Sequence, residues 1–279
     1  MAKTEAPYRC DECGWTTLKW VGRCGECQTW GTVVEVGAPT SASRQAVAIT
    51  PSAERVAKPI TQHTGSESGH VGTGVGEFDR VLGGGIVPGA VILLSGEPGV
   101  GKSTLLLDVA AKAAQGGKKV LYVSAEESAG QVYLRASRTN GLDDNLFLAN
   151  ETDLGGVLGH IDQVRPDLLI VDSVQTVSSG VLDSSAGGVA QVREVAATLT
   201  RVAKDSNLPI ILVGHVTKDG QVAGPRTLEH LVDVVCHFEG DRQTSLRFIR
   251  ALKNRFGPTD EVGCFEMSGE GIIEVPDPS

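Results

Sequence analysis

The segment "SGEPGVGKSTLLLDVA" (residues 95–110) carries residue types whose spacing suits phosphate binding. It satisfies G-x-x-x-x-G-K-[ST] after an apolar stretch and before a helical pattern, which is the context that defines a P-loop. Glycines let backbone N–H groups wrap phosphates, and the helix N-terminus adds positive potential. We therefore predict that ATP binds through Gly96, Glu97, Pro98, Gly99, Val100, Gly101, Lys102, Ser103 and Thr104.

Three of the polar residues near this loop have chemically distinct predicted roles. Lys102 should neutralise the β- and γ-phosphates and act in catalysis, while the Ser103 hydroxyl should bind magnesium. Asp172 ends the apolar stretch "LLIVD" and is the expected carboxylate for the same magnesium ion. The alternative for Asp172 is a cap of the turn that follows a strand.

Two adjacent glutamates are candidates for the base that activates water. Glu126 and Glu127 follow the apolar stretch "VLYVS". We choose Glu126 because it lies nearer the strand end, whereas Glu127 suits the first turn of the next helix. Beyond "ILVG", His215 is expected to sense the γ-phosphate; the alternative is a histidine that only satisfies local hydrogen bonds.

Two C-x-x-C pairs near the N-terminus predict a structural zinc site. The expected ligands are Cys10, Cys13, Cys24 and Cys27. Each pair turns two thiolates toward one ion, and a segment this short needs metal binding to fold. Thioredoxin-like redox chemistry is the alternative, but its βαβ context is missing. The accompanying tryptophans are expected to form the core of this module rather than a base-stacking platform; they are Trp15, Trp20 and Trp30.

The elements that position these residues divide the chain into three parts. Residues 1–36 hold the four-cysteine zinc-binding module, and residues 37–70, rich in Ala, Ser, Thr, Pro and Gly, are expected to be a flexible linker. In residues 71–279, apolar stretches alternate with helical patterns. This alternation predicts an α/β domain with a mostly parallel sheet flanked by helices, the longest of them over residues 188–206.

Composition narrows the function classes. The 279 residues are 41% hydrophobic and only 4% aromatic, with a net charge of −9. That charge argues against a generally basic nucleic-acid coat but leaves room for a local basic channel. No uncharged apolar run is long enough to span a membrane, and no signal-peptide pattern begins the chain. Six cysteines without a secretion signal favour a reducing, cytoplasmic setting.

Several motifs together identify a family. "LGGGIVPGAVILLSGEPGVGKSTLLL", "YVSAEES", "VAQVRE", "VGHVTKDGQVAGPRTLEH" and "LKNRFG" closely resemble the bacterial RadA (Sms) family of RecA-fold DNA repair ATPases. The resemblance implies a RecA-like ATPase domain in a homohexameric ring. It also implies a DNA-dependent motor on single-stranded DNA that drives branch migration of recombination intermediates. RecA recombinase and the replicative helicase machinery are the partner candidates.

The sequence also departs from that family. Ala125 stands where members commonly carry glycine, and Ala186 replaces a common proline. Neither change removes a functional group. The family normally continues into a Lon-protease-like domain, so we expect a shortened chain that lacks it.

The resemblance gives the segment "KNRFG" (residues 253–257) a role that its composition alone does not. In ring ATPases such a strand end faces the neighbouring subunit's nucleotide. Lys253 and Arg255 would then be catalytic fingers in trans, with Phe256 and Gly257 holding the shape of the tip. The alternatives are a solvated basic hairpin or cations that contact DNA phosphates.

DNA contact is expected from two loops. Lys218 and Arg226 lie in "TKDGQVAGPRTLEH", and a second loop follows Asp172; in RecA-fold rings both line the central pore. The alternative is an ordinary connection. Two other functions stay open: a signalling or clock-type RecA-fold ATPase that does not act on DNA, and a nucleotide-dependent adaptor without enzymatic activity.

Overall fold

A computed structural model describes residues 7–35, 50, 56–62, 69–215, 225–240, 244–269 and 271–276. The chain divides into two compact units, Met1–His63 and Thr64–Ser279. The four clustered cysteines belong to the first unit and the P-loop belongs to the second.

The first unit is a small antiparallel module. Within its described residues, three strands pair in the order β2-β1-β3; they are β1 (Tyr8–Cys10), β2 (Thr16–Thr17) and β3 (Val33–Glu35). Cys10, Cys24 and Val33 are its buried apolar residues, with Trp15 packed against them. A single turn of 3₁₀ helix, η2 (Ile60–Gln62), lies further along the chain. With so few buried side chains, apolar burial alone cannot hold this module together.

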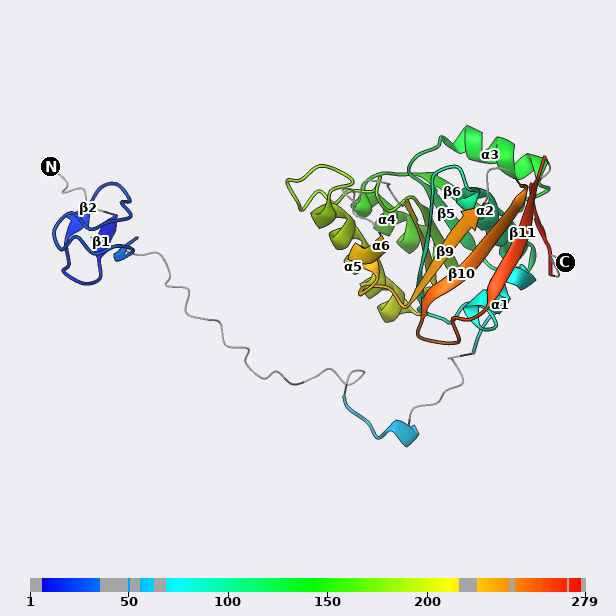
Figure 1. Ribbon diagram of the computed structural model, residues 1–279, viewed down its shortest axis with the longest axis horizontal. Helices are drawn as coiled ribbons and strands as arrows, with labels where there is room; N and C mark the ends of the chain where they lie inside the picture. The colour runs from blue at the N-terminus through cyan, green and yellow to red at the C-terminus, as the bar shows by residue number, and fades with distance from the viewer. Residues whose placement is uncertain are drawn as a thin grey trace. The chain divides into compact units, whose positions relative to one another are not determined.

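The second unit is built on one twisted sheet (Figure 1). Its described strands follow the order β12-β11-β10-β9-β4-β8-β7-β5-β6. The parallel strands are β4 (Val91–Gly96), β5 (Val120–Ser124), β6 (Leu146–Asn150), β7 (Leu168–Asp172), β8 (Ile210–His215) and β9 (Val234–Gly240). The antiparallel strands are β10 (Leu246–Asn254), β11 (Val262–Ser268) and β12 (Gly271–Glu274). The predicted mostly parallel sheet is confirmed.

Helices cover both faces of this sheet. One face packs against α1 (Gly76–Leu82), α2 (Lys102–Gln115) and α3 (Ala129–Arg138). The other packs against α4 (Leu154–Val164), α5 (Val189–Ser206) and α6 (Pro225–Leu228) (Figure 1). Strand β4 serves both layers because successive side chains alternate: Ile92 and Leu94 join the first core, Val91 and Leu93 the second. Among the described residues, no helix combines the length and apolar character that crossing a bilayer requires.

The parallel register brings the chemically important strand ends to one edge. Gly96 at the end of β4 is paired with His215 at the end of β8, and Ser124 of β5 is paired with Asp172 of β7. The amino ends of the same strands form the opposite edge. Strand β10 ends at this second edge, because it runs antiparallel to β9 and its last residue, Asn254, pairs with Val234, the first residue of β9.

Candidate functional site

The P-loop connects β4 to α2 at the carboxyl edge of the sheet. A Cβ atom on Gly96 would lie 2.2 Å from the Phe238 carbonyl oxygen, so this close approach excludes any other residue. Gly101 has a φ of 111°, in the left-handed region, and α2 begins at the next residue. Only glycine tolerates the close approach at position 96 and the left-handed backbone at position 101. The two glycines therefore allow the chain to turn directly from β4 into α2.

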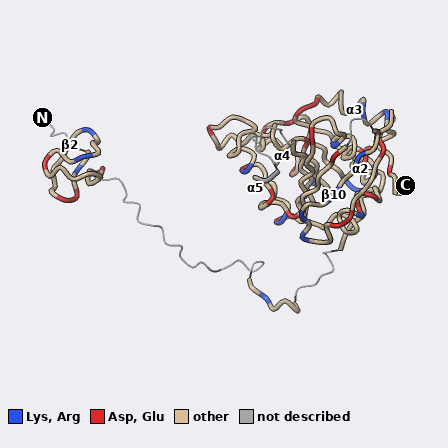
Figure 2. Tube along the Cα trace, viewed as in Figure 1, with Lys and Arg blue, Asp and Glu red and all other residues tan. Residues whose placement is uncertain are grey.

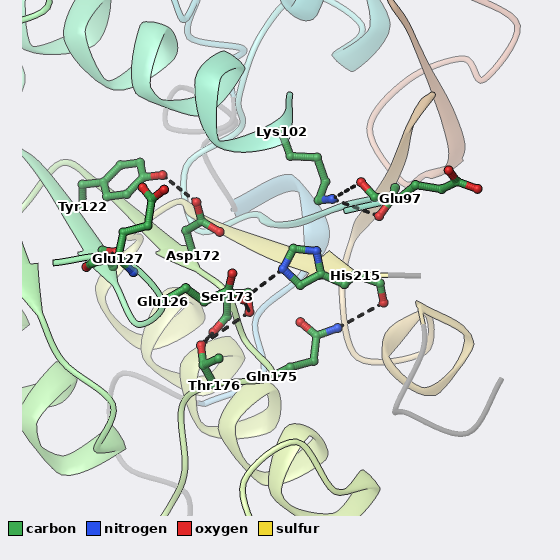
Figure 3. Close-up of polar contacts among 12 residues, drawn as sticks. Glu97, Lys102, Tyr122, Glu126, Glu127, Asp172, Ser173, Gln175, Thr176 and His215 are labelled. Atoms are coloured by element: carbon green, nitrogen blue, oxygen red, sulfur yellow. Dashed lines mark hydrogen bonds and ion pairs between the residues drawn. The ribbon is translucent and has the colours of Figure 1, made fainter. Parts of the chain in front are cut away.

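Lys102 is almost fully buried at the base of this loop. Its Nζ donates hydrogen bonds to the carbonyl oxygens of Gly96, at 2.9 Å, and Glu97, at 2.8 Å (Figure 3). Burial lowers the pKa of Lys102 to about 8, while the charges of Asp172 and Glu126 act in the opposite direction. A buried ammonium without a direct carboxylate partner suits an anionic ligand, and the loop therefore fits a nucleotide phosphate. Ser103 follows in the first turn of α2, as the P-loop pattern requires.

Asp172 is held in place by a tyrosine that the sequence did not identify. The Tyr122 hydroxyl donates a hydrogen bond of 2.7 Å to Asp172 Oδ2 (Figure 3). Tyr122 is buried in β5, and burial followed by the Asp172 charge raises its pKa well above the usual value. The phenol therefore stays protonated and donates its hydrogen bond to Asp172. This bond fixes the orientation of a carboxylate that is suited to bind magnesium.

The two glutamates after β5 point to different partners. Glu126 Oε1 accepts a hydrogen bond from Ser173 Oγ and lies 3.0 Å from His215 Nε2 (Figure 3). Glu127 instead forms an ion pair with Arg135 of α3. The geometry supports our choice of Glu126 as the base, because only Glu126 is drawn into the cluster that contains His215.

Glu126 is ionised despite its partial burial. Burial opposes ionisation, but the Ser173 hydrogen bond, the His215 contact and the Lys102 charge together outweigh it and lower the pKa of Glu126. The carboxylate is thus available as a proton acceptor at neutral pH. Ser173 had no sequence signal except its position directly after Asp172.

His215, the last residue of β8, links this cluster to the segment that follows β7. Its carbonyl oxygen accepts a 3.2 Å hydrogen bond from Gln175 Nε2 (Figure 3). Within the described part of the chain, two buried side-chain polar atoms have no hydrogen-bond partner, His215 Nδ1 and Gln175 Oε1. Buried polar atoms are normally paired, so these two suit a site that changes its contacts during function. The predicted sensor residue therefore lies in the same cluster as the predicted base.

The tip formed by residues 253–257 lies at the opposite edge from the P-loop of its own chain. Lys253 Nζ donates to the carbonyl oxygens of Glu229 and Val232, and Arg255 Nη1 lies 3.0 Å from Asp233 Oδ1. Gly257 packs tightly against α1, since a Cβ there would lie 3.3 Å from the Gly83 Cα. Six residues of extended strand separate the two edges along β4, roughly 17 Å. The structure does not bring these cations to the P-loop of the same chain.

The expected DNA-contacting loops are described in part. Lys218 lies outside the described residues, and Arg226 is described only as a backbone position in α6. The loop after Asp172 is held by the buried Gln191, whose amide bonds Ser179 and, further along, the carbonyl oxygens of Leu182 and Ser184. Figure 2 shows acidic and basic residues interspersed along the second unit.

The four cysteines of the first unit meet at one point. Their sulfur atoms all lie within 4.8 Å of one another. The Cys10–Cys27 and Cys13–Cys24 sulfur pairs are 3.7 and 3.6 Å apart. A tetrahedron with Zn–S bonds of about 2.3 Å has edges of about 3.8 Å, so the sulfurs already fit zinc.

The interpretation of the tryptophans as the module's core is wrong for two of them. Trp15 packs on the buried cysteines, but Trp20 and Trp30 are 64% and 73% exposed. Both rings flank Gly22, and the Arg23 guanidinium lies 5.7 Å from the Trp30 ring centroid. Of the three indoles, Trp15 alone packs against the buried residues Cys10, Cys24 and Val33.

Comparison with known protein families assigns both units. Residues 77–221, just over half of the chain, match the AAA domain family. The chain belongs to the AAA domain family. Residues 8–35 match the Rubredoxin metal binding domain family. An AAA-type ATPase domain uses ATP and magnesium, and the four-cysteine ribbon binds zinc, so the predicted cofactors are confirmed.

Proteins similar in sequence to this chain carry the name of the family that its motifs resemble. The DNA repair protein RadA of Mycolicibacterium smegmatis is 55% identical over the whole of this chain. RadA of Bacillus subtilis is 46% identical and that of Aquifex aeolicus 45%, again over the whole chain. The chain spans 61%, 61% and 62% of the length of these three relatives. The resemblance to RadA is confirmed.

A solved structure supports the fold. A KaiC-like protein from Pyrococcus horikoshii superposes with a TM-score of 0.61 at 20% sequence identity. The match covers 75% of this AAA chain and all of the archaeal one. At this identity the likeness concerns the fold alone, and it confirms the RecA-like arrangement of a mostly parallel sheet flanked by helices.

Proposed function

We propose that this chain is a DNA-dependent ATPase of the RadA type. It would act as a ring motor on single-stranded DNA and drive branch migration of recombination intermediates in DNA repair. One structural observation carries the proposal. Phosphate-binding and water-activating residues gather at one edge of the sheet, while the cationic tip lies at the opposite edge. A site divided in this way is completed by a second copy of the chain.

Glu126 is proposed as the base that accepts a proton from the attacking water. Its lowered pKa keeps it ionised, and Ser173 and His215 fix its orientation. His215 then connects the state of Glu126 to Gln175 through the contact at its own carbonyl oxygen. These contacts support a sensor role for His215. A change in the bound phosphate would alter the contact of Glu126 with His215, which is the last residue of β8.

Lys102 and Asp172 are proposed to hold the charged part of the substrate. Lys102 would exchange its two carbonyl acceptors for phosphate oxygens, which are stronger acceptors. Ser103 and Asp172 would hold magnesium, which neutralises charge on the phosphates when it is bound. Tyr122 keeps the Asp172 carboxylate in one orientation through the hydrogen bond to Oδ2.

Lys253 and Arg255 are proposed as fingers that serve a neighbouring subunit. An arginine side chain cannot reach across the roughly 17 Å that separates the tip from its own P-loop. The tip therefore either acts in trans or does not touch ATP. Arginine fingers contribute about 10³–10⁵ in rate in GTPases, so removal of Arg255 should nearly abolish turnover.

DNA is proposed to contact the loops at the ends of β7 and β8, including Lys218 and Arg226. Gln191 supports this by fixing the base of the first loop, while Val181 within it is 85% exposed. Loops in these positions follow the strand ends that carry Asp172 and His215, so DNA contact could alter hydrolysis directly. RecA recombinase and replicative helicase machinery are proposed partners on the resemblance alone.

A turnover assay with and without single-stranded DNA tests the proposal. We expect slow basal hydrolysis that rises severalfold when DNA is added, in a species whose native mass corresponds to a ring. Hydrolysis that DNA does not alter would favour a signalling or clock-type ATPase. Nucleotide binding without turnover in confirmed rings would favour an adaptor. Either result contradicts the proposal.

A further inference from the structure

Asp233 is a buried carboxylate beside the tip, at the residue before β9. Its side chain is 3% exposed. Oδ1 accepts a hydrogen bond from Arg255 Nη1 at 3.0 Å, and Oδ2 accepts from the Val91 backbone N–H, also at 3.0 Å, and from Lys204 Nζ. Oδ1 therefore contacts the tip, whereas Oδ2 contacts β4 and α5.

The two cations on this carboxylate differ in what surrounds them. Lys204 also donates to the Gly89 carbonyl oxygen at 2.9 Å, so it ties α5 to the sheet. Arg255 is fixed to Asp233 twice, because its backbone N–H also donates to the Asp233 carbonyl oxygen at 3.2 Å. The Arg255 side chain is nevertheless 53% exposed. One nitrogen of the guanidinium is anchored, and the rest of the group is open to solvent.

Burying the charged carboxylate of Asp233 costs free energy, which its hydrogen-bond and ion-pair partners must offset. Burial opposes ionisation of Asp233, but Lys204, the Val91 N–H and Arg255 outweigh it and lower the pKa of the carboxyl. A buried ion pair adds little net stability compared with apolar packing of the same volume. Lys204 and Val91 already satisfy Oδ2, so stability alone does not explain why Oδ1 holds a half-exposed arginine.

We propose that Asp233 is a positioning residue that aims Arg255 at a nucleotide polyphosphate held by a second copy of this chain. The carboxylate holds one nitrogen of the guanidinium, so that the fork keeps a single orientation before the partner's phosphate arrives. This inference rests on the proposed role of Arg255 in trans.

The variant Asp233→Asn tests the contact with little change in shape. Asparagine offers one acceptor oxygen, which the Val91 N–H and Lys204 require on the buried side. Its NH₂ group then faces Arg255 and cannot accept a hydrogen bond from it. We expect unchanged ATP affinity and a kcat lower by roughly tenfold or more, since small misplacements of catalytic groups cost up to about a hundredfold.

Lys204→Met is the matched control. It removes the other cation from the same carboxylate and leaves Arg255 in place, so thermal stability should fall while kcat stays within about twofold of the wild type. The double variant Asp233→Asn/Arg255→Ala should turn over no more slowly than Arg255→Ala alone, because both changes remove one function.

Mixing separates positioning from a purely structural role. Asp233→Asn has an intact P-loop, and Lys102→Ala has an intact tip, so mixed oligomers confirmed by native mass should regain activity above either protein alone. Damage confined to the fold of the Asp233→Asn subunit would not be repaired by its neighbour. Asp233→Glu, which keeps the charge and moves it by one methylene, replaces Asp233→Asn should the latter not fold.

The outcomes are distinct. Normal turnover by Asp233→Asn, while Arg255→Ala is inactive, would overturn the positioning role and leave the finger intact. Normal turnover by Arg255→Ala would overturn the proposed trans role itself. A kcat loss for Lys204→Met equal to that of Asp233→Asn would show that the cluster only holds the fold together, and would also refute the inference.

Discussion

Replacing Glu126 by glutamine removes the negative charge of the side chain but keeps its shape and one oxygen. The remaining oxygen still accepts the hydrogen bond from Ser173, so the loop after β5 should hold its position. The side chain is 39% exposed, and little stability depends on it. What disappears is the proton acceptor beside His215. General-base catalysis contributes about 10²–10⁴ in rate, which corresponds to about 3–5 kcal/mol in the activation free energy.

Single-turnover phosphate release and equilibrium ATP binding measure the two consequences separately. Glu126→Gln should bind ATP and magnesium with nearly wild-type affinity and hydrolyse it about 10²–10⁴ times more slowly. Glu127→Gln is the matched control, because it breaks only the partly exposed ion pair with Arg135, which contributes about 1 kcal/mol or less to stability. Normal turnover by Glu126→Gln together with an inactive Glu127→Gln would refute the assignment of the base.

Further predictions concern the loop, the metal and acid stability. Lys102→Ala should lose tight nucleotide binding, measured by titration with a fluorescent ATP analogue, while the thermal unfolding of the second unit stays cooperative. One zinc per chain should be found by elemental analysis, and Cys24→Ser should release it and disorder the first unit without unfolding the second; finding iron or no metal would contradict this. The pKa of Asp233 is lowered on folding, so its contribution to stability is fully present above the unfolded pKa of about 4 and is lost as the pH falls below that value and through the lower folded pKa. Asp233→Asn should therefore flatten the acid side of the unfolding free energy measured against pH.

The sequence could indicate which residues lie together at the candidate site, because strand ends converge by a general rule. Gly96, Asp172 and His215 each close an apolar stretch, and the carboxyl ends of parallel strands meet at one edge. Glu126 could be preferred over Glu127 for the same reason, and their different partners support that preference.

Contacts that depend on strand register were beyond the sequence. Tyr122 reaches Asp172 only because β5 lies beside β7, and Asp233 meets Arg255 only because β10 ends where β9 begins. The exposure of Trp20 and Trp30 was missed for another reason. Indoles are usually buried, but a module held by four thiolates needs little apolar core. Indoles that do not pack into that small core therefore lie on the surface.

A subunit-mixing assay tests the central claim, that one ATP site is completed by two copies of the chain. Arg255→Ala keeps its P-loop and loses its finger, whereas Lys102→Ala keeps its finger and loses its P-loop. Each should be inactive alone, and mixed rings confirmed by native mass should recover part of the wild-type turnover at interfaces where an intact P-loop meets an intact finger. If Arg255 instead contacted DNA phosphates, Arg255→Ala alone would show normal basal turnover, weaker DNA binding and a shallower salt dependence. That result, or confirmed mixed rings without any recovery, would contradict the account.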